Sequence, residues 1–119
     1  MSEAYDAIII GAGQAGPPLA SRLSHAGMRV AVVERKLFGG TCVNTGCMPT
    51  KTLVASAYVA HSARRASDYG VIINAAVEVD MARAKARADT VSLNARVGVE
   101  GLLYGMKGCT VLRLSLIHI

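Results

Sequence analysis

Two cysteines five positions apart, Cys42 and Cys47, are the side chains of this 119-residue sequence best suited to chemistry. Five residues of α-helix rise about 7.5 Å, more than the roughly 6.8 Å that separates the Cα atoms of bridged cysteines. A segment that joins the two must therefore be irregular, and Gly46 permits this. Pro49 predicts a helix that starts just beyond, so its dipole would stabilise a thiolate at Cys47. The spacing predicts thiol–disulfide exchange.

A structural metal site is the sharpest alternative for these cysteines. Zinc requires four ligands, and Cys109 is the only other cysteine. His25 and His61 have no ligand-pair spacing, so no metal site is predicted. Two buried, unreactive thiols remain an alternative, although they leave the flanking glycines unexplained. Cys109 is expected to be a small buried side chain on a strand, with no assigned role.

A second motif, Gly11-Ala12-Gly13-Gln14-Ala15-Gly16, follows a β-branched run at 5–10 and opens an expected helix at 14–26. Gly11 permits a tight turn, and Gly13 leaves room for a pyrophosphate at the helix N-terminus. Gly16 lets the helix approach the strand. Glu34 ends a second expected strand at 28–34, where a carboxylate accepts hydrogen bonds from ribose hydroxyls. The arrangement predicts a dinucleotide-binding βαβ unit, with an ordinary glycine turn as the alternative.

The remaining elements predict an α/β fold with a parallel sheet. The stretch at 36–46 is expected to be a glycine-rich loop, followed by a helix from Pro49 to about Ser67. A turn and a short extended piece are expected at 68–74. Asp80 is suited to cap a long helix that reaches about Tyr104, and a further strand is expected at 109–112.

The segment 39–51, Gly-Gly-Thr-Cys-Val-Asn-Thr-Gly-Cys-Met-Pro-Thr-Lys, resembles the active-site signature of the class I pyridine nucleotide–disulfide oxidoreductases. The resemblance extends to about Arg113. It implies the Rossmann-like FAD-binding βαβ unit at the N-terminus of a doubly wound flavoprotein with two dinucleotide-binding domains. The Pro-Thr-Lys ending is most similar to the mercuric reductase-like branch, and the family also includes dihydrolipoamide dehydrogenase-like enzymes.

The resemblance assigns roles to individual residues. Cys42 would be the thiol that exchanges with substrate, and Cys47 would be the charge-transfer thiolate that faces the flavin. Gly40 and Thr41 would contact the FAD phosphates. Lys51 would lie near the flavin ring, although without the cysteine pair it would be taken for a solvated helix lysine.

The family also implies an activity for a longer parent enzyme. Electrons would pass between NAD(P)H, FAD and the Cys42–Cys47 disulfide, to or from a disulfide, a dithiol or a mercuric ion. NAD(P)H would bind to a later domain, and the full-length enzyme would be a homodimer. The present stretch alone is expected to be inactive. Two alternatives are an FAD-binding oxidoreductase without a redox disulfide and a non-catalytic dinucleotide-binding fragment.

Charge and hydropathy argue against two classes of binding partner. The net charge of +5 comes from basic residues along an Ala-rich segment, a pattern typical of the solvated side of a helix rather than of a nucleic-acid track. The apolar run at 7–10 is too short for a signal peptide or a membrane span. Neither nucleic acid nor a membrane is therefore expected as a partner, and the resemblance implies a small-molecule or metal-ion substrate. A close cysteine pair without a secretory signal favours a reducing cytoplasm.

The last six residues, at 114–119, do not fit the pattern. They follow the expected strand without a turn, and Leu-Ser-Leu-Ile-His-Ile is the translation of CTG TCT CTT ATA CAC ATC. That DNA resembles the end of a transposase-based sequencing adapter. Residues 1–113 are thus predicted to be the N-terminal part of the FAD-binding domain, and 114–119 a non-native tail. A genuine C-terminal strand is the alternative.

Overall fold

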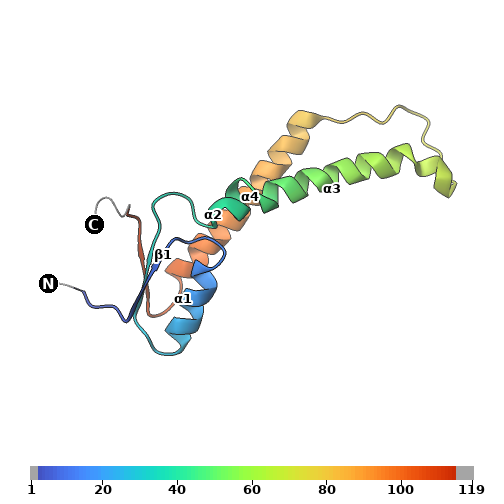
Figure 1. The fold of residues 1–119 in the computed structure, drawn as a ribbon. Helices are drawn as coiled ribbons and strands as arrows, with labels where there is room; N and C mark the ends of the chain where they lie inside the picture. Colours follow the sequence, from blue (N-terminus) through green and yellow to red (C-terminus); the bar gives the residue numbers. More distant parts are fainter. Residues whose placement is uncertain (1–2, 115–119) are drawn as a thin grey trace.

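A computed structural model of the chain describes residues 3–114 and shows a small parallel sheet from which a long helical hairpin projects (Figure 1). The strands are β1 (Ala7–Ile10), β2 (Val30–Val33) and β3 (Cys109–Leu112), in the spatial order β1-β2-β3. All pairs are parallel, and Ile8, Ala31 and Thr110 share one row of the register. The three predicted strands are confirmed, with shorter bounds than expected for the first two.

Helix α1 (Gly16–His25) connects β1 to β2 and completes the predicted βαβ unit. Pro17 and Pro18 occupy its first turn, where backbone N–H groups have no intrahelical partner. The helix therefore tolerates both prolines, because neither removes a bond that the helix itself would make.

Between β2 and β3 the chain forms α2 (Gly40–Asn44), α3 (Cys47–Arg64), a 3-10 turn η1 (Ala66–Tyr69) and α4 (Met81–Tyr104). The predicted loop at 36–46 is wrong over residues 40–44, which are helical. The cysteine helix starts two residues before Pro49, at Cys47, and ends before the predicted Ser67. The predicted cap of α4 is confirmed, because the Asp80 carboxylate accepts the Arg83 N–H at 2.9 Å.

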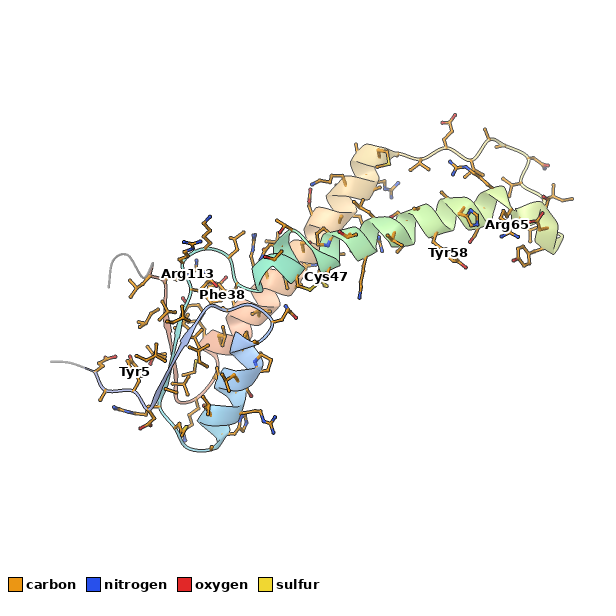
Figure 2. The ribbon with its side chains drawn as sticks, in the orientation of Figure 1. Tyr5, Phe38, Cys47, Tyr58, Arg65 and Arg113 are labelled. Carbon is orange, nitrogen blue, oxygen red and sulfur yellow. A yellow bond between two sulfur atoms is a disulfide. The ribbon has the colours of Figure 1, made fainter. Side chains whose placement is uncertain are left out.

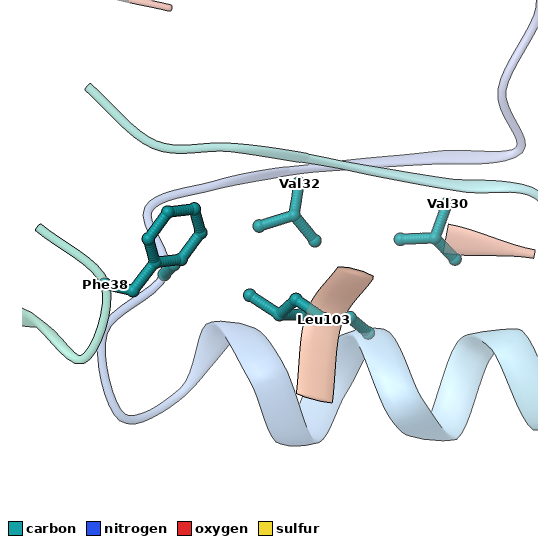
Figure 3. Packing of buried hydrophobic residues seen from close by; sticks show 6 residues of the cluster. Val30, Val32, Phe38 and Leu103 are labelled. Atoms are coloured by element: carbon teal, nitrogen blue, oxygen red, sulfur yellow. The ribbon is translucent and has the colours of Figure 1, made fainter. Parts of the chain in front are cut away.

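The core lies between one face of the sheet and the helices α1 and α4. Its largest fully buried side chains are Phe38, Leu103, Val30 and Val32 (Figure 3). Ile9 packs against this cluster from β1. Its neighbours Ile8 and Ile10 alternate to the other face, where each is 62% exposed. This other face is therefore uncovered at β1, whereas Ala31 and Val33 of β2, which share it by register, are buried.

No helix within residues 3–114 is long and apolar enough to cross a bilayer. The predicted non-native tail at 114–119 falls almost wholly outside the described residues. Leu114, its first residue, is exposed and has no regular structure.

Candidate functional site

The glycine motif forms the turn between β1 and α1. Gly11 has φ +99°, a conformation that side-chain-bearing residues rarely adopt. At Gly16 a methyl group would overlap the Gly11 carbonyl oxygen and would lie 3.5 Å from Ile9 Cγ2. The glycines therefore permit the sharp turn and the close approach of helix to strand that the sequence predicted.

Glu34 stands directly beyond β2, beside this turn. Its Oε2 accepts the Ala12 N–H at 2.9 Å, and its Oε1 accepts the Lys36 N–H at 2.8 Å. Each carboxylate oxygen has a further lone pair for a ligand hydroxyl. The carboxylate is thus held in place by backbone donors next to the glycine motif.

The two sequence motifs touch one another at a pair of glycines. Gly40 has φ +62°, and a methyl group built on it would lie 2.9 Å from Gly13 Cα. Next to this contact, the Gly39 N–H donates to Ala12 O at 2.7 Å and Gln14 Nε2 donates to Gly39 O at 3.2 Å. The N-terminus of α2 consequently lies against the turn that precedes α1.

Cys42 and Cys47 form a disulfide, with their Cα atoms 4.6 Å apart. The bond joins α2 to the first residue of α3 across a break at 45–46. A methyl group at Gly46 would lie 3.0 Å from Thr41 O, tighter than ordinary contact. The predicted irregular segment between the cysteines is confirmed, and Gly46 provides the space for it.

Cys47 is exposed at the N-terminus of α3 (Figure 2), whereas Cys42 is half-buried. A thiolate at Cys47 would benefit from the positive end of the helix dipole. Lys51 follows one turn later on α3 and is also exposed. Four residues correspond to about one helical turn, so Lys51 shares a face with Cys47.

Two side-chain amides in this region were not predicted from the sequence. Asn44 Nδ2 donates to both Phe38 O and Gly40 O at 2.9 Å, and Gln14 donates to Gly39 O as described above. Arg87 of α4 also holds the cysteine helix, because its Nη1 donates to Thr52 O at 3.1 Å. Asn44 lies between the two cysteines of the signature, and this position in the sequence could have indicated that it belongs to the site.

The third cysteine is separate from this site. Cys109 is half-buried on β3 and packs against the core cluster, and burial raises the pKa of its thiol. Within residues 3–114 no three His, Cys, Asp or Glu side chains gather as a metal site.

The residues around the glycine contact fit a dinucleotide. At the Gly13–Gly40 contact neither residue has a side chain between the dinucleotide turn and the start of α2. The first N–H groups of each helix have no intrahelical partner, and such groups favour an anion. Gly40 and Thr41 supply them from α2, although Pro17 and Pro18 supply none from α1. Together with the Glu34 carboxylate, this arrangement fits a phosphate-linked dinucleotide.

Comparisons with known proteins agree with this geometry. Residues 5–105 match the protein family described as pyridine nucleotide-disulphide oxidoreductase. The chain is 39% identical over 107 residues to a dihydrolipoyl dehydrogenase of Chlamydia muridarum, covering 90% of this chain and 23% of that protein. It is 44% identical over 100 residues to a dihydrolipoyl dehydrogenase of Rhizobium etli, covering 82% of this chain and 21% of that protein.

Among solved structures, the chain is similar to the Cu(II) complex of the HOCl-induced flavoprotein disulfide reductase RclA from Escherichia coli. The TM-score is 0.70 at 35% identity, over 93% of this chain and 22% of that one. The fold is thus that of the N-terminal FAD-binding region of flavoprotein disulfide reductases. The chain spans about a fifth of the length of these relatives.

Proposed function

Because the chain belongs to the pyridine nucleotide-disulphide oxidoreductase family, we propose that it serves in a flavin-dependent enzyme that exchanges electrons through the Cys42–Cys47 disulfide. The observation that supports this best is the disulfide itself. It joins α2 to α3, and α2 contacts the dinucleotide turn through Gly40 and Gly13. A dinucleotide on the turn would therefore lie beside the reactive sulfurs.

In this proposal FAD binds at the glycine turn and at the adjoining N-terminus of α2. The turn is provided by Gly11, Gly13 and Gly16. The Glu34 carboxylate accepts hydrogen bonds from the ribose hydroxyls. The Gly40 and Thr41 N–H groups donate to the phosphates. When bound, FAD supplies hydride and electron transfer that no side chain performs.

The cysteines carry the electrons between cofactor and substrate. The disulfide accepts two electrons and two protons to give two thiols, and Cys47 loses its proton at the start of α3. The Cys42 sulfur then attacks an oxidised substrate disulfide, which expels one substrate thiol. Cys47 displaces the second thiol and restores the disulfide. Lys51 lies on the same helix face as Cys47, where its positive charge would stabilise negative charge on the reduced flavin.

Two substrate classes are proposed, each supported by a different similarity. Similarity to dihydrolipoyl dehydrogenases favours a dithiol oxidised with the reverse flow of electrons, whereas the Pro-Thr-Lys sequence at 49–51 favours a mercuric ion. We further propose that NAD(P)H binds in a region beyond this chain, and that the whole enzyme is a homodimer located in a reducing cytoplasm. The present chain alone is proposed to be inactive.

The test starts at the gene. Sequencing of the source locus across the codon for Arg113 is expected to reveal a frame that continues into a second glycine fingerprint. A frame that encodes 114–119 and then stops would contradict both the adapter prediction and the catalytic proposal. A C-terminal cysteine pair in the continued frame would favour a mercuric substrate, and its absence a disulfide or dithiol.

The protein encoded by that frame then tests the chemistry. Anaerobic two-electron reduction is expected to produce a long-wavelength charge-transfer band between Cys47 and the flavin. Cys47→Ser should abolish the band, and Cys42→Ser should retain it because the exchange thiol is not the donor. Flavin binding without any change in titratable thiols on reduction would instead favour an FAD oxidoreductase that has no redox disulfide.

A further inference from the structure

We propose that Asn44 is a positioning residue for the cysteine pair: its side-chain amide fixes the short helix that carries Cys42 and so stabilises the disulfide against reduction. The inference rests on the proposed redox role of the pair. It adds to that role a side chain that has no redox chemistry of its own.

The geometry at Asn44 uses both hydrogens of its amide nitrogen. Asn44 is the last residue of α2, and Nδ2 donates to Phe38 O and to Gly40 O, each at 2.9 Å. Both neighbours are carbonyl oxygens, which only accept, so the nitrogen end of the amide must face them. The side chain therefore closes a double hydrogen bond from the end of α2 back to its start.

This double bond belongs to a larger arrangement in which three consecutive carbonyls are held by side-chain amides. Phe38 O and Gly40 O bind Asn44, and Gly39 O binds Gln14 Nε2 at 3.2 Å. The C=O and N–H of a trans peptide point in opposite directions. Fixing the carbonyls of Gly39 and Gly40 thus also fixes the N–H groups of Gly40 and Thr41.

Helix α2 needs such support because five residues form too short a helix to be stable alone. Phe38 is only 1% exposed and anchors the preceding segment in the core. Asn44 connects the last turn of α2 to this anchored segment, and Cys42 lies between the two attachment points. The Cys42 sulfur is consequently held within bonding reach of Cys47. A high effective concentration of one thiol near the other favours the disulfide.

The test measures the disulfide–dithiol equilibrium of the chain in the absence of flavin. The protein is equilibrated at low concentration with graded ratios of reduced and oxidised dithiothreitol, and the thiols are trapped by alkylation and counted by mass. Asn44→Asp keeps the shape of the side chain but replaces the donors with a charge that faces two carbonyl oxygens. The equilibrium constant is expected to shift about tenfold toward the dithiol, the order expected for the loss of two neutral hydrogen bonds.

Two further variants define the cause. Asn44→Gln retains both N–H donors on a longer side chain and should shift the equilibrium by less than about threefold. Asn94→Asp makes the same change of charge at an exposed position on α4 and should not shift it. If Asn44→Asp does not fold, Asn44→Ala replaces it, because this change removes both donors without adding a charge.

An unchanged equilibrium constant in a folded Asn44→Asp variant would overturn the proposal, and so would a lower melting temperature without any redox shift. If that variant does not fold, an unchanged constant in Asn44→Ala overturns it equally. The measurement contains no flavin, so it is independent of the charge-transfer test. A normal Asn44 shift in a protein that never shows the charge-transfer band would refute the proposed function and leave the positioning role intact.

Discussion

Gly40 lies against Gly13, so close that a methyl group on Gly40 would come within 2.9 Å of the Gly13 Cα atom. Gly13 belongs to the dinucleotide turn, and Gly40 begins the helix that carries Cys42. This backbone contact lies beside the hydrogen bond from the Gly39 N–H to Ala12 O, at 2.7 Å, which also joins the two sequence motifs. A methyl group at Gly40 would change the spacing between the proposed cofactor site and the disulfide, whereas one at Gly13 would lie 4.0 Å from Gly40 Cα, an ordinary contact distance.

The first prediction concerns this contact. Gly40→Ala should lower the free energy of unfolding by about 1–3 kcal/mol, because φ +62° is unfavourable for alanine and the new methyl group meets backbone. Urea denaturation followed by circular dichroism measures the change. Flavin affinity in the longer protein should fall as well, since α2 must move away from the turn.

Gly98→Ala is the matched control for that substitution. Gly98 lies within α4, and a methyl group there would contact nothing within 4 Å. Alanine is favoured over glycine in a helix interior by about 1 kcal/mol, so this variant should be more stable than the parent chain. Equal destabilisation by the two substitutions would contradict the proposed role of the Gly13–Gly40 contact.

The second prediction concerns the helix cap. Asp80→Ala removes the acceptor of the Arg83 N–H and should destabilise the chain by about 1 kcal/mol. Asp80→Asn retains an acceptor and should lower the free energy of unfolding by less. Thermal unfolding of both variants measures the difference, and equal losses would indicate that the cap hydrogen bond contributes little.

The third prediction concerns the pH dependence of the third cysteine. Burial raises the pKa of the Cys109 thiol, so the folded state holds the proton more tightly than the unfolded state does. Any stability from this difference is complete at neutral pH and is lost as the pH rises through the raised pKa. Iodoacetamide should therefore modify reduced Cys47 well before Cys109 at neutral pH.

Peptide mass spectrometry of the alkylated chain measures both rates. Modification of Cys109 should accelerate in urea, which exposes the thiol, and in the folded chain should accelerate only above the ordinary thiol pKa. A folded-state rate for Cys109 equal to its rate in urea at the same pH would show that burial does not protect the sulfur.

The sequence predicted the strands, the glycine turn and the Asp80 cap because each depends on local patterns. A β-branched run, a fingerprint of glycines and a capping residue before an Ala-rich stretch can be recognised without knowledge of the neighbours. Glu34 was placed beside the turn for the same reason, since its distance along the chain is fixed by the βαβ unit.

Helix α2 was missed because five residues show no helical periodicity, and Gly40, Thr41 and Val43 have low helix propensity. Tertiary contacts decide its conformation: the Asn44 amide, the disulfide to α3 and the approach to Gly13. The hydrogen bond from Gln14 to Gly39 O could not be predicted from the sequence either, because Gly39 lies 25 residues away along the chain. The early start of α3 reflects Gly46, which makes the break, while Pro49 is tolerated anywhere in the first turn.

The last prediction concerns the uncovered face of the sheet. Ile8 and Ile10 are each 62% exposed on a parallel sheet, a fold in which both faces are normally covered. The 119-residue chain expressed alone should therefore associate at micromolar concentrations. Replacement of both residues by threonine keeps the β-branched shape and should raise the concentration at which the chain remains monomeric, with little change in melting temperature.

Ile9→Thr provides the contrast, because Ile9 packs against the core cluster from the same strand. This substitution buries a hydroxyl group in place of an ethyl group and should cost about 2 kcal/mol without improving solubility. Light scattering and analytical ultracentrifugation separate the two effects. A parent chain that stays monomeric and melts cooperatively at high concentration would show that the exposed isoleucines do not drive association, and that this βαβ unit with its helical hairpin is stable without a cover for the sheet.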